Sequence, residues 1–303
     1  MTSRIPKPVR AVHRRLRATF PDRRVVRNVQ GVRLVLPWEH KLPYYAKLYP
    51  HYGQNLVELA RLLGSGTGPF GVVDIGANVG DSALQILAAT DARIVCVEAD
   101  EHWLKYLHAN VDQEPRITVA PVFLSTSDQD AEYAPVRDGG TTRFETVASD
   151  QRAGPAILNP QQLKDAYADI GSVRLIKSDT DGFDTRIVPR AAQTWSDDRP
   201  VLFFEFDPGL TRQAGEPDPG AVWQELAAIG YREFALWDNF GLPLGMISLA
   251  DIERAQAVLD RPFEKLGYHY WDVAAFHDAD EAGRRAVTGL VPMRFPVDSA
   301  LGS

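Results

Sequence analysis

The segment from residue 72 to residue 87 constrains the fold of this chain more than any other. Its sequence, VVDIGANVGDSALQIL, starts as an apolar run that reaches an aspartate, passes through a glycine-containing turn and continues with apolar residues at helical spacing. This order predicts a buried strand, a tight turn and a helix. Units of this kind occur in doubly wound α/β domains, in which ligands bind beyond the carboxyl ends of the strands.

The alternation of strand and helix patterns continues along the chain. Strands are expected at residues 69–75, 92–98, 116–124, 172–179, 199–208, 232–239 and 268–277. Helices are expected at residues 81–90, 101–111, 159–170, 183–195, 219–231 and 249–263. Pro189 should break or kink the helix in which it lies, and the polar stretch of residues 125–154 should be a long loop. Continuous apolar strands between amphipathic helices predict one parallel sheet covered on both faces.

The composition excludes several classes of protein. Hydrophobic residues make up 45% and charged residues 24% of the 303 residues, so the chain can bury a substantial core as a soluble globular protein. Its one cysteine, Cys96, cannot form an intramolecular disulfide, and its apolar neighbours predict an inert buried thiol. The sequence has no run of about 18 apolar residues, so no transmembrane helix is expected. The basic N-terminus is not followed by the apolar core of a signal peptide. We expect a cytoplasmic protein.

Charge is distributed unevenly along the chain. The formal net charge is -7, yet residues 1–40 hold ten basic groups and only two acidic ones, which leaves 23 basic and 38 acidic groups elsewhere. The acidic remainder argues against a nucleic-acid partner. We therefore divide the chain into a basic N-terminal arm, residues 1–40, and a single domain, residues 41–303. A short helix that packs on the domain is the preferred interpretation of residues 9–20. The alternative is a binding arm that contacts a membrane surface or an anionic partner.

The turn after the first strand has the residue types of a ligand-binding loop. Gly76 and Gly80 permit backbone angles closed to other residues, and Asn78 tolerates the left-handed region. The helix that follows favours an anionic group at its start. Asp74, at the end of the strand, is suited to accept hydrogen bonds from an ammonium or hydroxyl group.

Glu98 ends the second strand, 22 residues after Gly76. An acid at about this spacing typically binds the hydroxyls of a ribose. A dinucleotide would prefer Gly-x-Gly-x-x-Gly, but Asn78 occupies the middle position, so we favour S-adenosylmethionine over NAD as the ligand. A tight turn without any ligand is the remaining alternative. The residues expected to bind the cofactor are Asp74, Gly76, Asn78, Gly80, Glu98 and Ser125.

A second group of acids follows the fourth and fifth strands, at the same edge of the predicted sheet. These acids are Asp179, Asp181, Asp184, Glu205 and Asp207. Acids at strand ends in apolar surroundings can have raised pKa values and act as bases. Asp184 and Asp207 are expected to cap helices or to be solvated. For Asp179, Asp181 and Glu205, catalytic and structural roles are equally weighted.

Four segments in this order resemble the FkbM-type methyltransferases, a branch of the class I S-adenosylmethionine-dependent enzymes. They are VVDIGANVGDSALQIL, VCVEAD, VRLIKSDTDGFDTRIV and PVLFFEFDP, and the resemblance covers about residues 52–277. It implies a seven-stranded Rossmann-like sheet whose last strand is antiparallel. It also implies O-methylation of a hydroxyl, often that of a sugar in a glycan, glycolipid or secondary metabolite. The chain departs from the family pattern at three positions. Asp181 and Asp184 replace glutamates, so each of these side chains is shorter by one methylene, and Phe183 replaces a small residue.

Methyl transfer to a hydroxyl needs an in-line approach and a general base. Asp179 is the first candidate for this base, followed by Asp181 and Glu205. The aromatic residues of WDNF, 237–240, either stack on an acceptor or, as we prefer, pack in a hairpin turn, and Tyr52 either covers the cofactor or packs at a helix start.

The histidines show no metal-ligand spacing, so no metal site is expected. A core or surface role is expected for each of His51, His269 and His277. Two other functions stay open: an NAD-dependent oxidoreductase, and a non-catalytic module that keeps only the cofactor turn.

Overall fold

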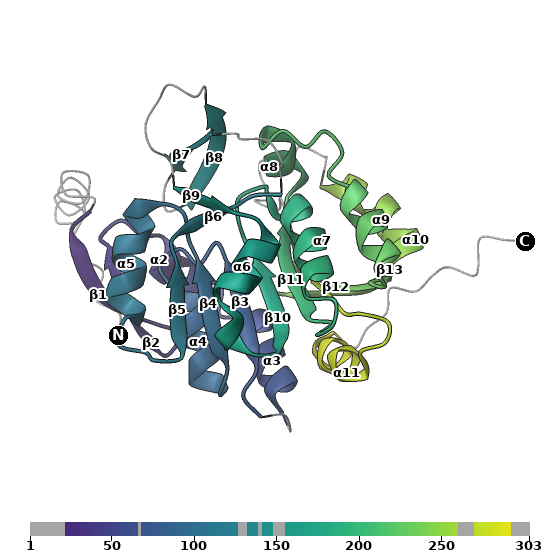
Figure 1. Ribbon diagram of the computed structural model, residues 1–303, viewed down its shortest axis with the longest axis horizontal. Helices are drawn as coiled ribbons and strands as arrows, with labels where there is room; N and C mark the ends of the chain where they lie inside the picture. The colour runs from purple at the N-terminus through teal and green to yellow at the C-terminus, as the bar shows by residue number, and fades with distance from the viewer. Residues whose placement is uncertain are drawn as a thin grey trace, which may run out of the picture.

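A computed structural model describes residues 22–65, 68–126, 132–138, 141–147, 155–259 and 270–291 (Figure 1). The helix expected within residues 9–20 lies outside the described residues, as does His269. Among the described residues, no helix combines the length and the apolar character needed to span a membrane.

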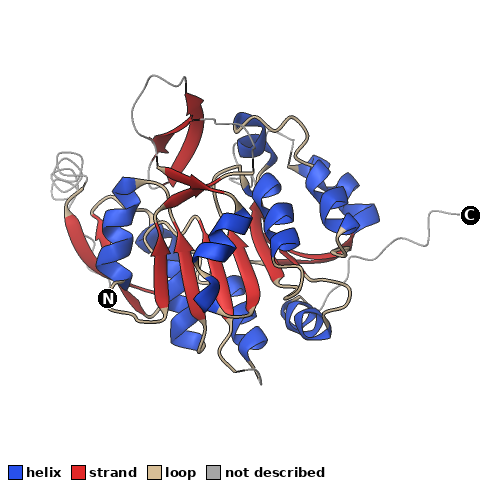
Figure 2. Cartoon of the chain, viewed as in Figure 1, coloured by secondary structure: helices blue, strands red, loops and turns tan. Residues whose placement is uncertain are grey.

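A sheet of eight strands forms the centre of the molecule (Figure 2). Its order is β13 (Pro243–Ser248), β12 (Glu233–Asp238), β14 (Trp271–Ala275), β11 (Val201–Phe206), β10 (Val173–Ser178), β3 (Gly71–Ile75), β4 (Arg93–Val97) and β5 (Ile117–Ala120). Neighbours from β11 to β5 pair in parallel, whereas β14 lies antiparallel to both β11 and β12. The expected doubly wound sheet with an antiparallel last strand is confirmed, and β14 separates the fifth main strand from the sixth.

The sheet has one strand more than expected, because β13 pairs with β12 at the edge. WDNF spans the end of β12 and the turn that follows it. Trp237 lies in β12 and is buried, and Phe240 in the turn stacks on Tyr49 with 4.1 Å between ring centroids. The preferred interpretation of WDNF, a hairpin turn with packed aromatic residues, is confirmed.

The third expected strand is divided at Pro121. Residues before the proline form β5 in the main sheet, and residues after it form β6 (Val122–Leu124), which pairs with β9 (Ala156–Leu158). A proline has no N–H to donate to a strand ladder, so the chain leaves the sheet there.

The prediction of a long loop over residues 125–154 is wrong in part. β7 (Glu132–Asp138) and β8 (Thr141–Val147) form an antiparallel hairpin (Figure 1). Phe144 of β8 is buried against Phe123, with 4.9 Å between the ring centroids. The pattern was missed because the sequence of these two strands shows no clear apolar alternation.

Helices cover both faces of the sheet. On one face lie α3 (Gln54–Gly64), α4 (Asp81–Ala89), α5 (Glu101–Val111) and α11 (Glu281–Leu290). On the other face lie α6 (Pro160–Ala166), α7 (Asp184–Thr194), α9 (Ala221–Ala228) and α10 (Leu249–Ala255). α7 continues through Pro189, so of the two expected effects, a break or a kink, the proline does not cause a break. The loss of one helical hydrogen bond is offset by the buried face of α7, which includes Ile187 and Val188.

The second half of the expected basic arm packs on the domain. β1 (Arg24–Val29) and β2 (Val32–Pro37) form an antiparallel hairpin, and α2 (Leu42–Leu48) follows it. Leu34 and Leu36 of the hairpin are fully buried in one cluster with Trp103 and Tyr106 of α5. Residues of the hairpin and of α2 thus lie at the edge of the sheet where the strands end, beside the turns that follow β3 and β10.

Candidate active site

The turn after β3 has the strained backbone that its residue types predict. Gly76, Asn78 and Gly80 have φ angles of 74°, 49° and 81°. A side chain at Gly76 would overlap the carbonyl oxygen of Asp179, so the turns after β3 and β10 meet through their backbones. At Gly80 a Cβ would instead meet Leu107 of α5 at 2.7 Å, so this glycine serves helix packing.

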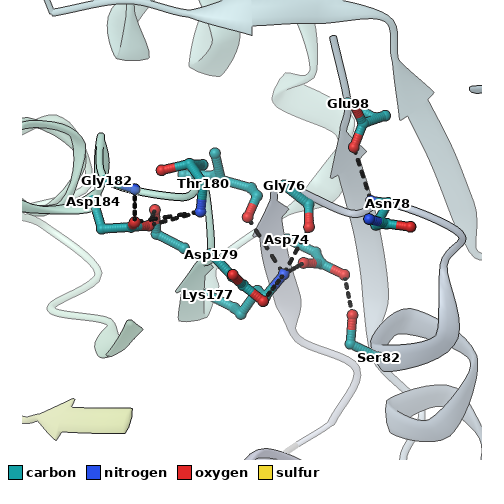
Figure 3. Close-up of polar contacts among 12 residues, drawn as sticks. Asp74, Gly76, Asn78, Ser82, Glu98, Lys177, Asp179, Thr180, Gly182 and Asp184 are labelled. Carbon is teal, nitrogen blue, oxygen red and sulfur yellow. Dashed lines mark hydrogen bonds and ion pairs between the residues drawn. The ribbon is translucent and has the colours of Figure 1, made fainter. Parts of the chain in front are cut away.

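Glu98 lies at the end of β4 and organises the same turn (Figure 3). Its carboxylate accepts hydrogen bonds from the backbone N–H groups of Asn78 and Asp100, each at 2.8 Å. Burial raises its pKa from 4.5 to about 7, because the charged form loses its hydration. Each carboxylate oxygen can accept more than one hydrogen bond, so Glu98 keeps acceptor capacity toward the adjoining cavity.

Asp74 is fully buried and has partners within the protein itself (Figure 3). The Lys177 ammonium lies 3.0 Å from one carboxylate oxygen, and the Ser82 hydroxyl donates to the other at 2.7 Å. Lys177 also donates to the carbonyl oxygen of Gly76 at 2.8 Å. The ammonium and hydroxyl expected as partners of Asp74 are therefore side chains of this chain, and Asp74 holds the strand ends together.

The charge state of Lys177 follows from this arrangement. Burial lowers its pKa, but the carboxylates of Asp74 and Asp179 outweigh that effect, so the pKa of Lys177 rises above its ordinary value. Lys177 is a buried cation at every physiological pH.

Asp184 organises the turn after β10, and the prediction that it caps a helix or is solvated is wrong. It is only 2% exposed. Its carboxylate accepts from the Ser178 hydroxyl at 2.6 Å and from the backbone N–H groups of Thr180 and Gly182 (Figure 3). Burial raises its pKa to about 6. Asp207 does cap α8 (Pro208–Gln213), since it accepts from the N–H of Leu210 at 2.9 Å, as predicted.

Asp179 and Asp181 lie in the turn that Asp184 stabilises. The side chain of Asp179 is 54% exposed and lies 3.8 Å from the Lys177 ammonium. Asp181 has a φ of 51°, and burial, followed by repulsion from Asp179, raises its pKa to about 8. A non-glycine residue in the left-handed region costs free energy, and such strain is concentrated at functional sites.

Two cavities meet at these turns. The smaller one is lined by Glu98 and by the apolar side chains of Val97, Val122, Phe123, Leu124, Phe144 and Phe183. The larger one has a volume of about 460 Å³ and extends beneath the N-terminal hairpin, α2 and α3. The residues that line both are Gly76, Asn78, Asp179 and Asp181.

The larger cavity has acidic and aromatic walls. The acids that line it are Asp81, Asp179, Asp181, Glu205, Asp207 and Asp272. Its aromatic residues are Tyr45, Tyr52, Phe203 and Tyr270. Tyr52 therefore lines the cavity beside the candidate cofactor turn, which is the position expected if its side chain covers the cofactor.

The cavities do not contain every residue expected at the site. Of the expected cofactor-binding residues, Asp74, Gly80 and Ser125 do not line either cavity. Ser125 follows β6 and its N–H donates to the carbonyl oxygen of Leu158, so it supports the strand pair behind the smaller cavity. The three catalytic candidates, Asp179, Asp181 and Glu205, all line the larger cavity.

Sequence reasoning missed three residues of the site. Lys177 and Asp272 are charged residues inside otherwise apolar strands, a signal that each has a buried partner. Thr142 lies in the hairpin that was predicted as loop; it accepts from the Trp103 indole at 2.8 Å and donates to Asp100 at 2.7 Å. These bonds fix β8 against the smaller cavity.

The chain described by the structure offers no metal site: no group of three or more His, Cys, Asp or Glu side chains among the described residues is arranged to hold an ion. His277 packs edge-on against Tyr231, with 5.4 Å between ring centroids, and Cys96 is fully buried. Burial raises the pKa of the Cys96 thiol well above its ordinary value, which fits an inert thiol.

Comparisons with known proteins identify similar solved structures but no family. No protein-family model matches the sequence, and a search of curated proteins finds no relative. TYW2 of P. horikoshii in complex with MeSAdo is 13% identical, with a TM-score of 0.42 over 85% of this chain and 73% of that chain. TYW2 of M. jannaschii in complex with AdoMet is 12% identical, with a TM-score of 0.42 over 84% of this chain and 87% of that chain.

A third similar structure is precorrin-6y C5,15-methyltransferase from Geobacter metallireducens. It is 9% identical, with a TM-score of 0.38 over 74% of this chain and 87% of that chain. Likeness at this level does not identify a ligand or a substrate. The strand order and the antiparallel β14 do identify the architecture: the chain has the Rossmann-like class I methyltransferase fold.

Proposed function

We propose that this protein is an S-adenosylmethionine-dependent methyltransferase that methylates a hydroxyl, of a sugar in a glycan, glycolipid or secondary metabolite. The observation that carries the proposal is the meeting of two unlike cavities at Gly76, Asn78, Asp179 and Asp181. A largely apolar cavity with Glu98 on its wall and two further acids where it meets the larger cavity suits an adenosine. The larger polar cavity leaves room for a second reactant. The methyltransferase would then bind both reactants across one strained turn.

The residues present fit this cofactor. Glu98 lies where a ribose acceptor is needed, and Phe123, Phe144 and Phe183 can enclose an adenine ring. Asp179 and Asp181 face both cavities, and the carboxylate of Asp179 can attract the positive charge of the ammonium and sulfonium groups. S-adenosylmethionine, when bound, supplies an electrophilic methyl group that needs no metal or redox partner.

The protein's part in the reaction is to position the acceptor hydroxyl and to remove its proton. We assign the proton to the carboxylate of Asp179, which borders both cavities and is held beside the Lys177 ammonium. Asp181 and Glu205 also line the acceptor cavity, but burial raises the pKa of Asp181 to about 8 and that of Glu205 well above its ordinary value. Asp181 would therefore be largely protonated at neutral pH, and burial disfavours the charged form of Glu205, which favours Asp179 as the base.

The fold counts against the alternative of an NAD-dependent oxidoreductase. Dinucleotide-binding domains have six parallel strands in the order 3-2-1-4-5-6, whereas here the antiparallel β14 lies between β11 and β12. The turn after β3 also lacks the middle glycine that admits a pyrophosphate. The resemblance of four segments to FkbM-type enzymes supports the same choice.

Two measurements test the proposal. Calorimetric titration with S-adenosylhomocysteine and with NAD⁺ should show binding of the first and little or none of the second; tighter binding of NAD⁺ would reverse the assignment. Incubation with methyl-labelled S-adenosylmethionine and a panel of glycosides should transfer label to a hydroxyl. Binding without transfer to any member of a broad panel, sugars and polyketides included, would favour the non-catalytic module.

A further inference from the structure

Two acids of the larger cavity occupy directly opposed positions in the sheet. Glu205 of β11 and Asp272 of β14 are register partners on antiparallel strands, and both line the cavity. Opposed side chains on one face of an antiparallel pair lie close together, and like charges at such positions destabilise the sheet. A folded chain that keeps this pair needs a source of positive charge or a proton beside it.

Within the described residues, neither acid has a cationic partner. Asn55 donates to Asp272 at 2.9 Å, and no described side chain or backbone group donates a hydrogen bond to the carboxyl of Glu205. Lys41 and Lys177 also line the cavity. The Lys177 ammonium lies 3.0 Å from the Asp74 carboxylate, and its charge offsets only part of the rise that burial causes in the pKa of Asp272. His40 also lines the cavity, but burial lowers its pKa to about 4, so it is uncharged at neutral pH.

The tyrosines beside this pair respond to the same excess of negative charge. Burial raises the pKa values of Tyr52 and Tyr270 well above their ordinary value, and the carboxylates of the cavity add to this effect: first Asp179 for Tyr52, and first Glu205 for Tyr270. Burial also raises the pKa of Asp272 to about 7 and that of Glu205 well above its usual range. An added anion would be repelled by this wall, and an added cation would be attracted to it.

We propose that the acceptor carries a protonated amine, which binds against Glu205 and Asp272 while a neighbouring hydroxyl of the same molecule is methylated. The inference rests on the proposed function and narrows its acceptor to the chemistry of an amino sugar. The ammonium would favour the charged forms of both acids and make charge-assisted hydrogen bonds to them, and Tyr52 and Tyr270 line the same cavity.

The same contacts direct the reaction to oxygen. A protonated amine has no lone pair to accept a methyl group, and a nearby carboxylate pair favours the protonated form. The proton that leaves in the reaction is the proton of the hydroxyl, which passes to Asp179. The amine is thus an anchor, and acceptors that bear a carboxylate or phosphate at its position are excluded.

Three matched probes test this inference: the methyl glycosides of glucosamine, glucose and glucuronic acid. Their affinities for the protein saturated with S-adenosylhomocysteine can be measured by ligand-observed NMR at low salt. We expect the glucosamine glycoside to bind at least about tenfold more tightly than the glucose glycoside, and the glucuronide to bind more weakly than both. Equal affinities, tighter binding of a neutral or anionic probe, or no binding of any probe would overturn the inference.

Variants of the two acids test whether Glu205 and Asp272 cause the preference for the glucosamine glycoside over the glucose glycoside. Glu205→Gln and Asp272→Asn keep shape and should each reduce the preference for glucosamine to less than about threefold, whereas Asp197→Asn, at an exposed residue outside the cavity, should leave it unchanged. A preference that survives in both cavity variants would also overturn the inference.

A parallel titration separates the failure of this inference from failure of the proposed function. The two cavity variants should bind S-adenosylhomocysteine and S-adenosylmethionine within about twofold of wild type. If they lose S-adenosylmethionine but keep the amine preference, the pair serves the sulfonium and the inference is wrong. If the wild type binds neither nucleoside, the proposed function itself fails; if it binds them without an amine preference, only the acceptor assignment fails.

Discussion

The ammonium of Lys177 lies 3.0 Å from the carboxylate of Asp74, and both side chains are buried between two neighbouring strands. The same ammonium donates to the carbonyl oxygen of Gly76 at 2.8 Å. One cation therefore joins the end of β10 to the turn after β3. This ion pair therefore joins the turns after β3 and β10, which border both cavities.

Replacing Lys177 with Met should destabilise the protein strongly. The substitution leaves the charge of Asp74 buried without its partner, which typically costs about 3–5 kcal/mol of the free energy of unfolding. Urea unfolding of the variant measures the loss, and Lys105→Met, at an exposed site on α5, is the matched control. A loss below about 1 kcal/mol in Lys177→Met would contradict the ion pair's structural role.

Gly76→Ala should weaken the binding of S-adenosylhomocysteine. The new Cβ would overlap the carbonyl oxygen of Asp179, so one of the two turns must move. Gly171→Ala is a matched control, because Gly171 has a φ of 81°, close to the 74° of Gly76, but no atom within 4 Å of its Cβ position. Both variants should lose about 1 kcal/mol or more of stability from the positive φ. Only Gly76→Ala should lose at least about tenfold in affinity, and equal affinities would refute the close approach.

Asp181→Asn should gain stability relative to wild type as pH rises. The carboxyl of Asp181 has a pKa of 3.8 when unfolded and about 8 when folded, because burial disfavours its charged form. Between these values the folded state binds more protons, so wild-type stability falls with rising pH by up to about 1.4 kcal/mol per unit. Asn tolerates the positive φ and does not titrate. The melting temperature of the variant should exceed that of wild type increasingly from pH 4 to pH 8, and a constant difference would contradict the assignment.

Much of the fold followed from the sequence because the central strands are continuous apolar runs. β3, β4, β10 and β11 lie within the expected ranges, since a strand buried on both faces leaves a strong local signal. The hairpin of β7 and β8 did not, because its stability depends on pairing between segments and on a few residues such as Phe144. β13 is an edge strand with only one neighbour, β12, and its signal is equally weak.

The site was predictable only where local chemistry defines it. Asn78 and Glu98 were found because each follows a strand end in a turn of recognisable composition. The partners of Asp74 could not be found, since Lys177 is more than a hundred residues away and the pairing of β3 with β10 brings them together. The opposition of Glu205 and Asp272 depends in the same way on the register of β11 and β14.

Asp179→Asn should separate catalysis from folding. The amide keeps the shape of the side chain but cannot take a proton, and a general base commonly contributes about 100-fold to 10,000-fold in rate. With any acceptor that the wild type methylates, turnover should fall at least about 100-fold while S-adenosylhomocysteine affinity stays within about threefold. Asp184, which holds the backbone of this turn, offers the contrast: Asp184→Asn should lower the melting temperature instead. Normal turnover in Asp179→Asn would assign the proton to another group.

The most direct test of the central claim is calorimetric titration of S-adenosylhomocysteine into wild type and Glu98→Ala. Glu98 lies in the smaller cavity, and its loss removes a charge-assisted bond to the ribose worth about 1.5–3 kcal/mol. Glu101→Ala, at an exposed residue of α5, controls for the loss of an acid. The account predicts binding to wild type and to Glu101→Ala, with at least about tenfold weaker binding to a folded Glu98→Ala. Equal affinity in Glu98→Ala, or no binding to wild type, would contradict it.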